Sequence, residues 1–159
     1  MDLLQEGIKG KFQIGIRIAS EEEPKFEFYT SRLGIGYKNI LPFYRKNISE
    51  NPNVEVKMLH FFINTGIRDT AYYWNELSKC LKVYTNLKKE CPTLDSLNIG
   101  GGFPIKNSLA FDYDYAYMVD EIINQIKIAC DEAEVPVPNI FTEFGSFTVG
   151  ESGGAIYKV

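Results

Sequence analysis

The chain has 159 residues, of which 45% are hydrophobic and 24% charged, which is the balance of one soluble globular domain with a real core. A net charge of −4 provides no basic surface for nucleic acid or acidic lipid, no apolar run is long enough to cross a membrane, and the N-terminal residues lead us to expect no signal peptide. The three cysteines form no CxxC pair and there is a single histidine, so we expect a cytoplasmic protein without a disulfide framework or a histidine-rich metal centre.

The first element expected in chain order is a β-strand over residues 12–19, because apolar residues alternate strictly with polar or small ones. Its two faces are Phe12, Ile14, Ile16 and Ile18 on one side and Gln13, Gly15, Arg17 and Ala19 on the other. A loop over 21–29 and a short helix over 39–48, with Pro42 in its first turn, are expected next. A second strand is expected over 54–63. One of its faces would carry Val54, Val56, Met58, His60 and Phe62.

A long helix follows, for which Asp69 is the expected cap and Pro92 the stop. Its apolar stripe is Ala71, Trp74, Leu77, Leu81, Tyr84 and Leu87. A third strand over 95–101 leads into three glycines, and a third helix is expected to start near Asp112. Its buried stripe would be Tyr115, Met118, Val119, Ile122, Ile126 and Cys130. A fourth strand is expected over 139–143, and the Gly-rich tail over 145–159 is predicted as a helical turn leading to a strand.

The four expected strands begin at nearly constant intervals of roughly 40 residues and three are followed by clear helices, which indicates a parallel α/β fold. A doubly wound sheet and part of a (β/α)₈ TIM-type barrel both fit this rhythm. Polar groups on otherwise apolar strands favour the barrel, whose interior is polar near the catalytic end. A full barrel takes about 250 residues, so about four βα units amount to a half barrel. Such a piece would leave open sheet edges, for which we expect self-association into a homo-oligomer.

Two features at strand ends carry the expected chemistry. The turn Gly100-Gly101-Gly102 allows backbone N–H groups to approach a phosphate closely, although a tight turn without a ligand would need the same glycines. Glu143 ends the fourth strand and would point into the barrel mouth, either as a ligand for a protonated ring nitrogen or in an ion pair with Arg17. His60 and Phe62 share a strand face, where an aromatic side chain could stack on a flat cofactor or merely fill the barrel.

Several stretches, taken in chain order, resemble the alanine-racemase-like barrel of the ornithine, diaminopimelate and arginine decarboxylases. Residues 14–20 (IGIRIAS) are similar to the strand with an inward arginine, and residues 31–35 (SRLGI) to the segment (S/K)-(K/R)-F-G-(I/L). Residues 59–65 (LHFFINT) resemble LHFHIGS, residues 97–104 (LNIGGGFP) resemble LDIGGGFP, and residues 142–146 (TEFGS) resemble TE(S/P)GR. The likeness covers residues 13–159 and is nearest to biosynthetic arginine decarboxylase.

The resemblance implies roles for these residues around pyridoxal phosphate. Glu143 would hydrogen-bond the pyridine nitrogen, the backbone of Gly100, Gly101 and Gly102 would bind the phosphate with the Thr65 hydroxyl beside it, and Arg17 would support the ring-facing wall. The sequence departs from the family at the stacking histidine, which falls on Phe62, and at the phosphate-binding arginine, which falls on Ser146. The motif glycine falls on Asn64 and the aspartate on Asn98.

The resemblance also implies what residues 1–159 lack. The family's Schiff-base lysine belongs to an earlier strand, and Lys57 is expected to face the helices, so no catalytic residue is assigned here. The chain would be one partial domain, the C-terminal half of the barrel without its N-terminal half or the C-terminal β-domain, and inactive alone. Three hypotheses remain: a piece of an enzyme converting its small-molecule substrate arginine to agmatine and CO₂ for polyamine biosynthesis, a non-catalytic regulatory relative, or an unrelated phosphate-binding module.

Overall fold

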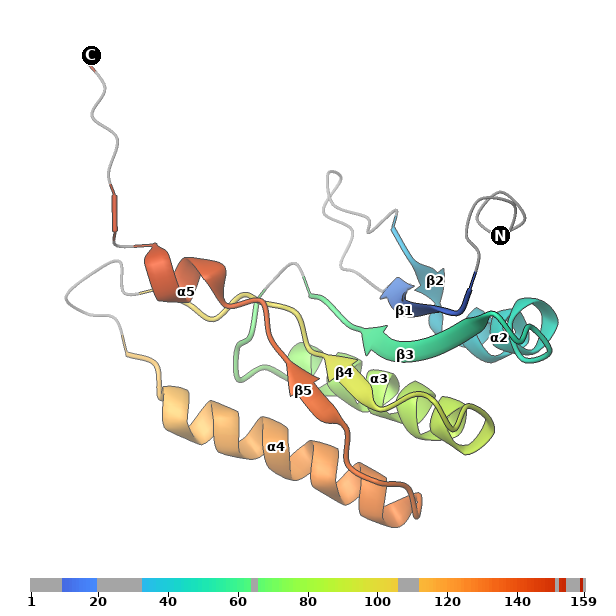
Figure 1. Cartoon of the computed structure of the whole chain (residues 1–159). Helices are drawn as coiled ribbons and strands as arrows, with labels where there is room; N and C mark the ends of the chain where they lie inside the picture. Colours follow the sequence, from blue (N-terminus) through green and yellow to red (C-terminus); the bar gives the residue numbers. More distant parts are fainter. Residues whose placement is uncertain are drawn as a thin grey trace.

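Five parallel strands form one sheet in the computed structural model, which describes residues 10–19, 33–63, 66–105, 112–150, 152–153 and 158. The strands lie in the order β2-β1-β3-β4-β5, and α3 and α4 run side by side along one face of the sheet (Figure 1). The strands are β1 (Phe12–Ala19), β2 (Ile35–Gly36), β3 (Val54–His60), β4 (Ser96–Asn98) and β5 (Asn139–Phe141). The helices are η1 (Tyr37–Asn39, a 3₁₀ turn), α2 (Ile40–Asn47), α3 (Ala71–Glu90), α4 (Tyr115–Glu132) and α5 (Gly145–Val149).

The strand order identifies the sheet as a piece of a barrel. From β1 onward, β3, β4 and β5 are each added beside the strand that precedes them in this series, always on the same side. A doubly wound sheet instead reverses its order at a switch point and carries helices on both faces. The partial barrel expected from the sequence is therefore confirmed, with a short additional strand, β2, that the sequence did not predict.

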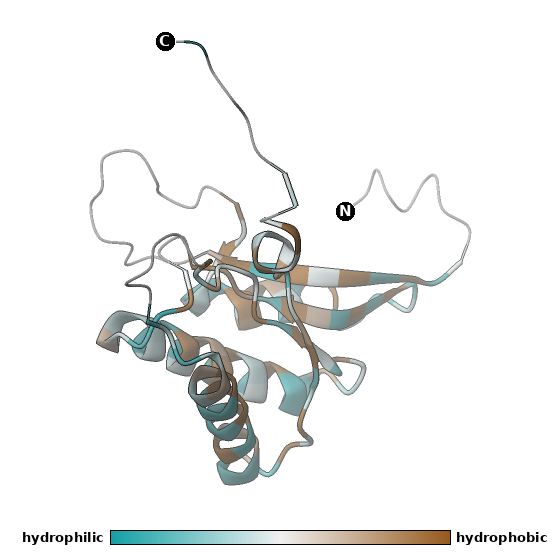
Figure 2. Ribbon diagram, turned by 90° about the vertical axis from the view of Figure 1, so that its left-hand side faces the viewer, coloured by the Kyte–Doolittle hydropathy of each residue, from teal (hydrophilic) through white to brown (hydrophobic). Residues whose placement is uncertain are grey.

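The core lies between the sheet and the helices, where the apolar residues of both layers meet (Figure 2). The helical stripes expected from the sequence are largely confirmed, because Leu77, Leu81, Tyr84 and Leu87 of α3 and Met118, Ile122, Ile126 and Cys130 of α4 are buried. Ala71 and Val119 were assigned wrongly to these stripes, since both are exposed. Each lies at the margin of its helix's apolar stripe, where burial depends on the neighbouring element rather than on helical spacing.

A register shift in β3 corrects the face predicted for that strand. Ile14 pairs with Val56 and Gly15 with Met58, so Lys57 has no partner on β1 and forms a bulge. Val54 and Val56 are buried before the bulge, and Leu59 is buried after it, whereas Met58 and His60 are only partly buried. The prediction that Val54 and Val56 share a face with Met58 and His60 is therefore wrong, because the extra residue changes the phase of the side chains.

Element boundaries shift by a few residues from those expected. Thr70, and not Asp69, caps α3: its hydroxyl accepts a hydrogen bond from the amide of Tyr73 at 3.2 Å. The third and fourth strands end earlier, at Asn98 and Phe141, and α4 begins at Tyr115 with Asp114 as its cap. The loop over 21–29, Asn64 and Thr65, and most of the tail after 150 lie outside the described residues.

Candidate active site

A row of polar side chains crosses the sheet near the carboxyl ends of the strands. The strand pairing aligns Arg17 of β1 with His60 of β3, and His60 with Asn98 of β4. Asn98 in turn pairs with Phe141 of β5, two residues before Glu143. Since parallel strands end at the same edge, side chains far apart in sequence meet here. Arg17, His60 and Glu143, which the sequence places on separate strands, thus lie along one edge of the sheet.

The carboxylate of Glu143 is the centre of the row. Its Oε1 accepts a hydrogen bond from Nδ2 of Asn98 at 2.9 Å, and Nε2 of His60 lies 3.5 Å from the same oxygen. Asn98 is itself oriented, because its Oδ1 accepts a hydrogen bond from the amide of Gly100 at 2.8 Å. The Glu143 side chain is 51% exposed. The carboxylate is thus held from one side and accessible from the other.

His60 is half-buried between an anion and a cation. Burial lowers its pKa, the nearby Glu143 carboxylate raises it, and Arg17 lowers it again. Its Nε2 is buried and, although close to Glu143, lacks the alignment of a hydrogen bond. We therefore expect a neutral imidazole at pH 7, with its charge dependent on whatever occupies the carboxylate.

Arg17 contacts Phe62 rather than Glu143. Its guanidinium carbon lies 5.5 Å from the centroid of the Phe62 ring, a cation–π distance, and its Nε is buried without a hydrogen-bond partner. The ion pair with Glu143, considered from the sequence as an alternative, is not formed in the described part of the chain. The site therefore contains a cation whose Nε has no acceptor among the described residues.

The three glycines interlock the loops that follow neighbouring strands. A Cβ on Gly101 would overlap the carbonyl oxygen of Glu143, and one on Gly102 would lie 2.8 Å from Cα of Gly66. The amide of Glu143 donates to the carbonyl of Gly100 at 2.8 Å, and the amide of Ile67 donates to that of Gly102 at 2.9 Å. The glycines are thus required by close backbone packing, whatever ligand they bind.

The same turn leaves donors available. In the described part of the chain, the amides of Gly101 and Gly102 donate to no acceptor. Adjacent free amides of this kind can bind an anion such as a phosphate. Gly100 joins the turn to Glu143 in two ways: its carbonyl accepts from the Glu143 amide, and its amide donates to Asn98, whose side chain donates to the Glu143 carboxylate. The two predicted features therefore lie in a single site.

The comparisons with known proteins agree with this geometry. The family model described as "Pyridoxal-dependent decarboxylase, pyridoxal binding domain" matches residues 1–150. The chain belongs to this family. Among curated relatives, the biosynthetic arginine decarboxylase of Citrifermentans bemidjiense is 34% identical over 101 residues, covering 59% of this chain and 16% of that protein. That of Pseudomonas putida is 23% identical over 150 residues, covering 87% of this chain and 24% of that protein. The chain therefore spans about a quarter or less of these two relatives.

Solved structures of pyridoxal-dependent decarboxylases share the fold. The biosynthetic arginine decarboxylase of Campylobacter jejuni superposes with a TM-score of 0.64 at 22% identity, over 92% of this chain and 24% of that one. The diaminopimelate decarboxylase of M. jannaschii in complex with L-lysine gives 0.69 at 22% identity, over 87% and 33% of the two chains. The alanine-racemase-like barrel is thus confirmed for this pyridoxal-dependent decarboxylase domain. Within the described residues, no helix combines the length and apolar character needed to span a membrane.

Thr65 and Ser146 are the remaining members of the pyridoxal site predicted from the sequence. Thr65 lies outside the described residues. Ser146 is exposed in the first turn of α5, where its carbonyl oxygen accepts a hydrogen bond from the Gly150 amide. Asn98 belongs to the cluster, although the sequence identified it only as an inward polar residue at the position of the family aspartate and gave it no role in the site. Its position between the buried Leu97 and Ile99 was the available signal that its side chain faces the site.

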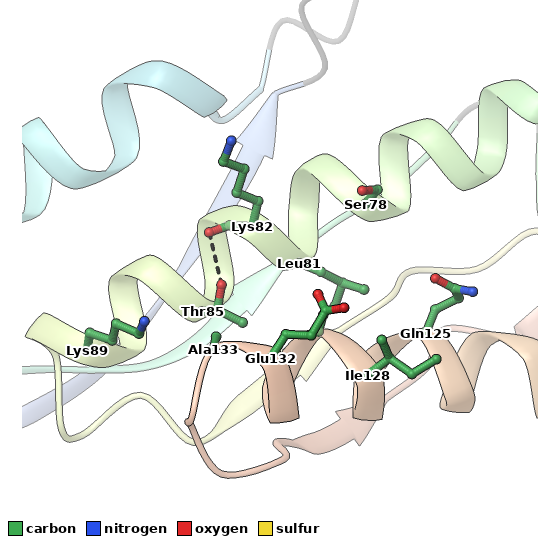
Figure 3. A pocket seen from close by; sticks show the side chains of 10 residues that line it. Ser78, Leu81, Lys82, Thr85, Lys89, Gln125, Ile128, Glu132 and Ala133 are labelled. Atoms are coloured by element: carbon green, nitrogen blue, oxygen red, sulfur yellow. Dashed lines mark hydrogen bonds between the residues drawn. The ribbon is translucent and has the colours of Figure 1, made fainter.

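A separate groove of about 540 Å³ lies on the outer side of the decarboxylase domain, between α3 and α4 (Figure 3). Leu81, Ile128 and Ala129 contribute apolar side chains, and Lys82 and Lys89 of α3 and Glu132 of α4 contribute charges. The hydroxyl of Thr85 donates to the carbonyl of Lys82 at 3.2 Å. The groove contains neither the glycine turn nor the Glu143 cluster, and we assign no chemistry to it.

Proposed function

We propose that this chain is the part of an arginine-decarboxylase-like enzyme that binds the ring and phosphate of pyridoxal phosphate. The observation that carries the proposal is the link between Glu143 and the turn that offers two free amides: its backbone amide donates to the Gly100 carbonyl, and its carboxylate accepts from Asn98, which in turn accepts from the Gly100 amide. A protonated ring nitrogen needs an anionic acceptor and a phosphate needs hydrogen-bond donors, and a carboxylate and two adjacent free amides are both present at one end of the sheet.

The individual residues would divide the binding as follows. Glu143 would accept a hydrogen bond from the protonated pyridine nitrogen and so keep the proton on that nitrogen, and the amides of Gly101 and Gly102 would bind the phosphate. Phe62 offers an apolar ring, held by Arg17, against one side of the cofactor. Thr65 and Ser146 are placed beside the phosphate by resemblance alone. When bound, the cofactor supplies an electron sink for the charge released by loss of CO₂.

The rest of the enzyme would complete the domain. We place residues 1–159 in the C-terminal half of the barrel, in the cytoplasm, with the catalytic lysine on another part of the polypeptide. β5 is exposed along its whole length, and Ile140 and Phe141 are 36% and 47% exposed, so another chain segment or a second copy would cover this edge. Size-exclusion chromatography of the 159-residue chain should show dimers or larger species, and a clean monomer would contradict self-association.

Arginine is the proposed substrate because both curated relatives described above are named biosynthetic arginine decarboxylases. The reaction would be loss of the α-carboxylate to give agmatine and CO₂. The parent polypeptide, expressed with every segment that its gene encodes, should release ¹⁴CO₂ from carboxyl-labelled arginine in preference to ornithine or diaminopimelate. Preference for either of the other two would reject the substrate but not the cofactor site.

A non-catalytic relative is the second candidate, favoured by Phe62 and Ser146. Phenylalanine cannot hydrogen-bond as histidine does, and serine lacks the charge of the family arginine. The sequence of the parent polypeptide distinguishes the two candidates. A lysine on another barrel strand would support the enzyme hypothesis, and its absence would support the hypothesis of a non-catalytic regulatory relative.

The decisive experiment is an absorbance titration of the chain with pyridoxal 5′-phosphate. We expect weak, non-covalent binding, with no borohydride-trapped adduct at a unique lysine. Glu143→Gln should weaken binding about tenfold, because a charged hydrogen bond is replaced by a neutral one. Glu132→Gln, which removes the same charge from an exposed position on α4, is the matched control. Equal affinities for both variants would overturn the assignment of Glu143.

A further inference from the structure

Two side chains converge on a single oxygen of Glu143. Nδ2 of Asn98 donates to Oε1 at 2.9 Å, and Nε2 of His60 lies 3.5 Å from that same atom. The contacts of this carboxylate in the described part of the chain all involve Oε1, which leaves Oε2 without a described partner. The carboxylate is therefore oriented with one oxygen restrained and the other available.

The orientation of Asn98 is determined by the backbone. Since the amide of Gly100 is a donor, the side-chain atom 2.8 Å from it must be the oxygen, so the nitrogen faces Glu143. An aspartate at this position would place a second carboxylate oxygen against Oε1, and the repulsion between the two would favour a proton on one of the acids or on His60. Asparagine thus allows Glu143 to remain ionised without help from a proton on His60.

We propose that Asn98 and His60 are positioning residues that hold Glu143 by Oε1 and present Oε2 to the ring nitrogen of the cofactor. Asn98 supplies the permanent hydrogen bond. His60, whose Nε2 has no aligned partner, is the adjustable member and responds to the charge on Glu143. The charged groups facing His60 are Arg17 on β1 and Glu143 after β5. The inference rests on the proposed cofactor site, but the coupling among the three side chains can be measured without any cofactor.

The single histidine of the chain makes the measurement direct. The imidazole signals in a ¹H–¹⁵N correlation spectrum must belong to His60, so its pKa can be followed by titration in each variant. Glu143→Gln should lower that pKa relative to the wild type, because the attractive carboxylate charge is removed. Asn98→Asp should raise it, because a second carboxylate joins the row. Asn124→Asp adds the same charge at an exposed position of α4 and should leave it unchanged.

Cofactor binding supplies the second readout. Asn98→Asp should weaken pyridoxal 5′-phosphate binding about tenfold at pH 7, since the two acids compete for the proton that the ring nitrogen needs. His60→Phe removes the donor and should also weaken binding, whereas His60→Gln, with an amide nitrogen to donate, should restore most of the loss.

The two readouts separate the two proposals. Identical His60 titrations in the wild type, Glu143→Gln and Asn98→Asp would overturn the positioning role, even if the cofactor binds at Glu143. If the His60 pKa differs between the wild type and the two variants but the wild type binds no pyridoxal 5′-phosphate, the positioning role is retained and the proposed function is rejected. Because the Glu143 side chain is half exposed, Glu143→Gln is expected to fold. Its His60 titration therefore still tests the positioning role if Asn98→Asp does not fold.

Discussion

The guanidinium of Arg17 lies over the ring of Phe62, with its carbon 5.5 Å from the ring centroid. We expect this contact to stabilise the end of the barrel. Phe62→Leu keeps an apolar side chain but removes the aromatic face, and should cost about 1 kcal/mol. Phe62→Ala also removes packing and should cost about 3 kcal/mol. Urea unfolding measures the stability of each variant. A double-mutant cycle of Arg17→Met, Phe62→Leu and the variant with both changes gives the coupling energy between the two side chains. A coupling energy near zero would show that the contact contributes nothing.

Gly101 should tolerate no side chain. The Cβ of an alanine would collide with the backbone carbonyl of Glu143, which cannot move without breaking the bond from the Glu143 amide to Gly100. Gly101→Ala should therefore destabilise the chain by about 2 kcal/mol or more. Gly145→Ala is the matched control, because a Cβ there meets nothing within 4 Å. Thermal melting compares them, and equal melting temperatures would argue against the interlocked loops.

Glu76 is fully buried on α3 and connects that helix to the η1 turn. Its carboxylate accepts hydrogen bonds from the Tyr37 hydroxyl at 2.8 Å and from Lys79 Nζ at 3.0 Å. Glu76→Leu removes the acceptors from both donors and should cost about 3 kcal/mol, whereas Glu76→Gln retains an acceptor for Tyr37 and should cost less. Urea midpoints test this order. A leucine variant as stable as the wild type would mean that packing alone fixes η1 against α3.

Asp95 should make stability depend on pH in the acid range. The Ser96 hydroxyl and then Lys57 hold the pKa of this carboxyl below its usual 3.8. The unfolded chain thus takes up the proton at higher pH than the folded chain, so the stabilisation is present above about pH 4 and is lost as the pH falls below it. The difference in unfolding free energy between wild type and Asp95→Asn should shrink from pH 6 to pH 3. In a Lys57→Met background this change should be smaller, and a difference independent of pH would exclude the effect.

Much of the site could be predicted from the strand pattern. Arg17, His60 and Glu143 each follow a run of alternating residues, and parallel strands bring their carboxyl ends to one edge, so their meeting required no knowledge of side-chain contacts. The partners within the cluster could not be read in the same way. Whether Glu143 pairs with Arg17 or with Asn98 depends on distances of a few ångströms, which the alternation of residues does not determine.

The differences between the predicted and the observed fold also have local physical reasons. In the segment 54–63, one alternating set continues from Val54 to Phe62 and another contains Leu59 and Phe61, so the sequence supports both phases and does not reveal the bulge between them. Asp69 and Thr70 are both able to cap a helix, and the packing of α3 determines which of these two adjacent residues does so. The two-residue strand β2 is too short to show any period.

The bulge at Lys57 has a consequence for the length of β3. Because the bulge accommodates one extra residue between Val56 and Met58, the loss of the Lys57 codon would leave Val56 opposite Ile14 and Met58 opposite Gly15 in a regular ladder, and His60 would keep its face of the sheet. β3 can therefore lose a residue at the bulge without turning its side chains, whereas a deletion after Met58 would reverse the face of every residue that follows it.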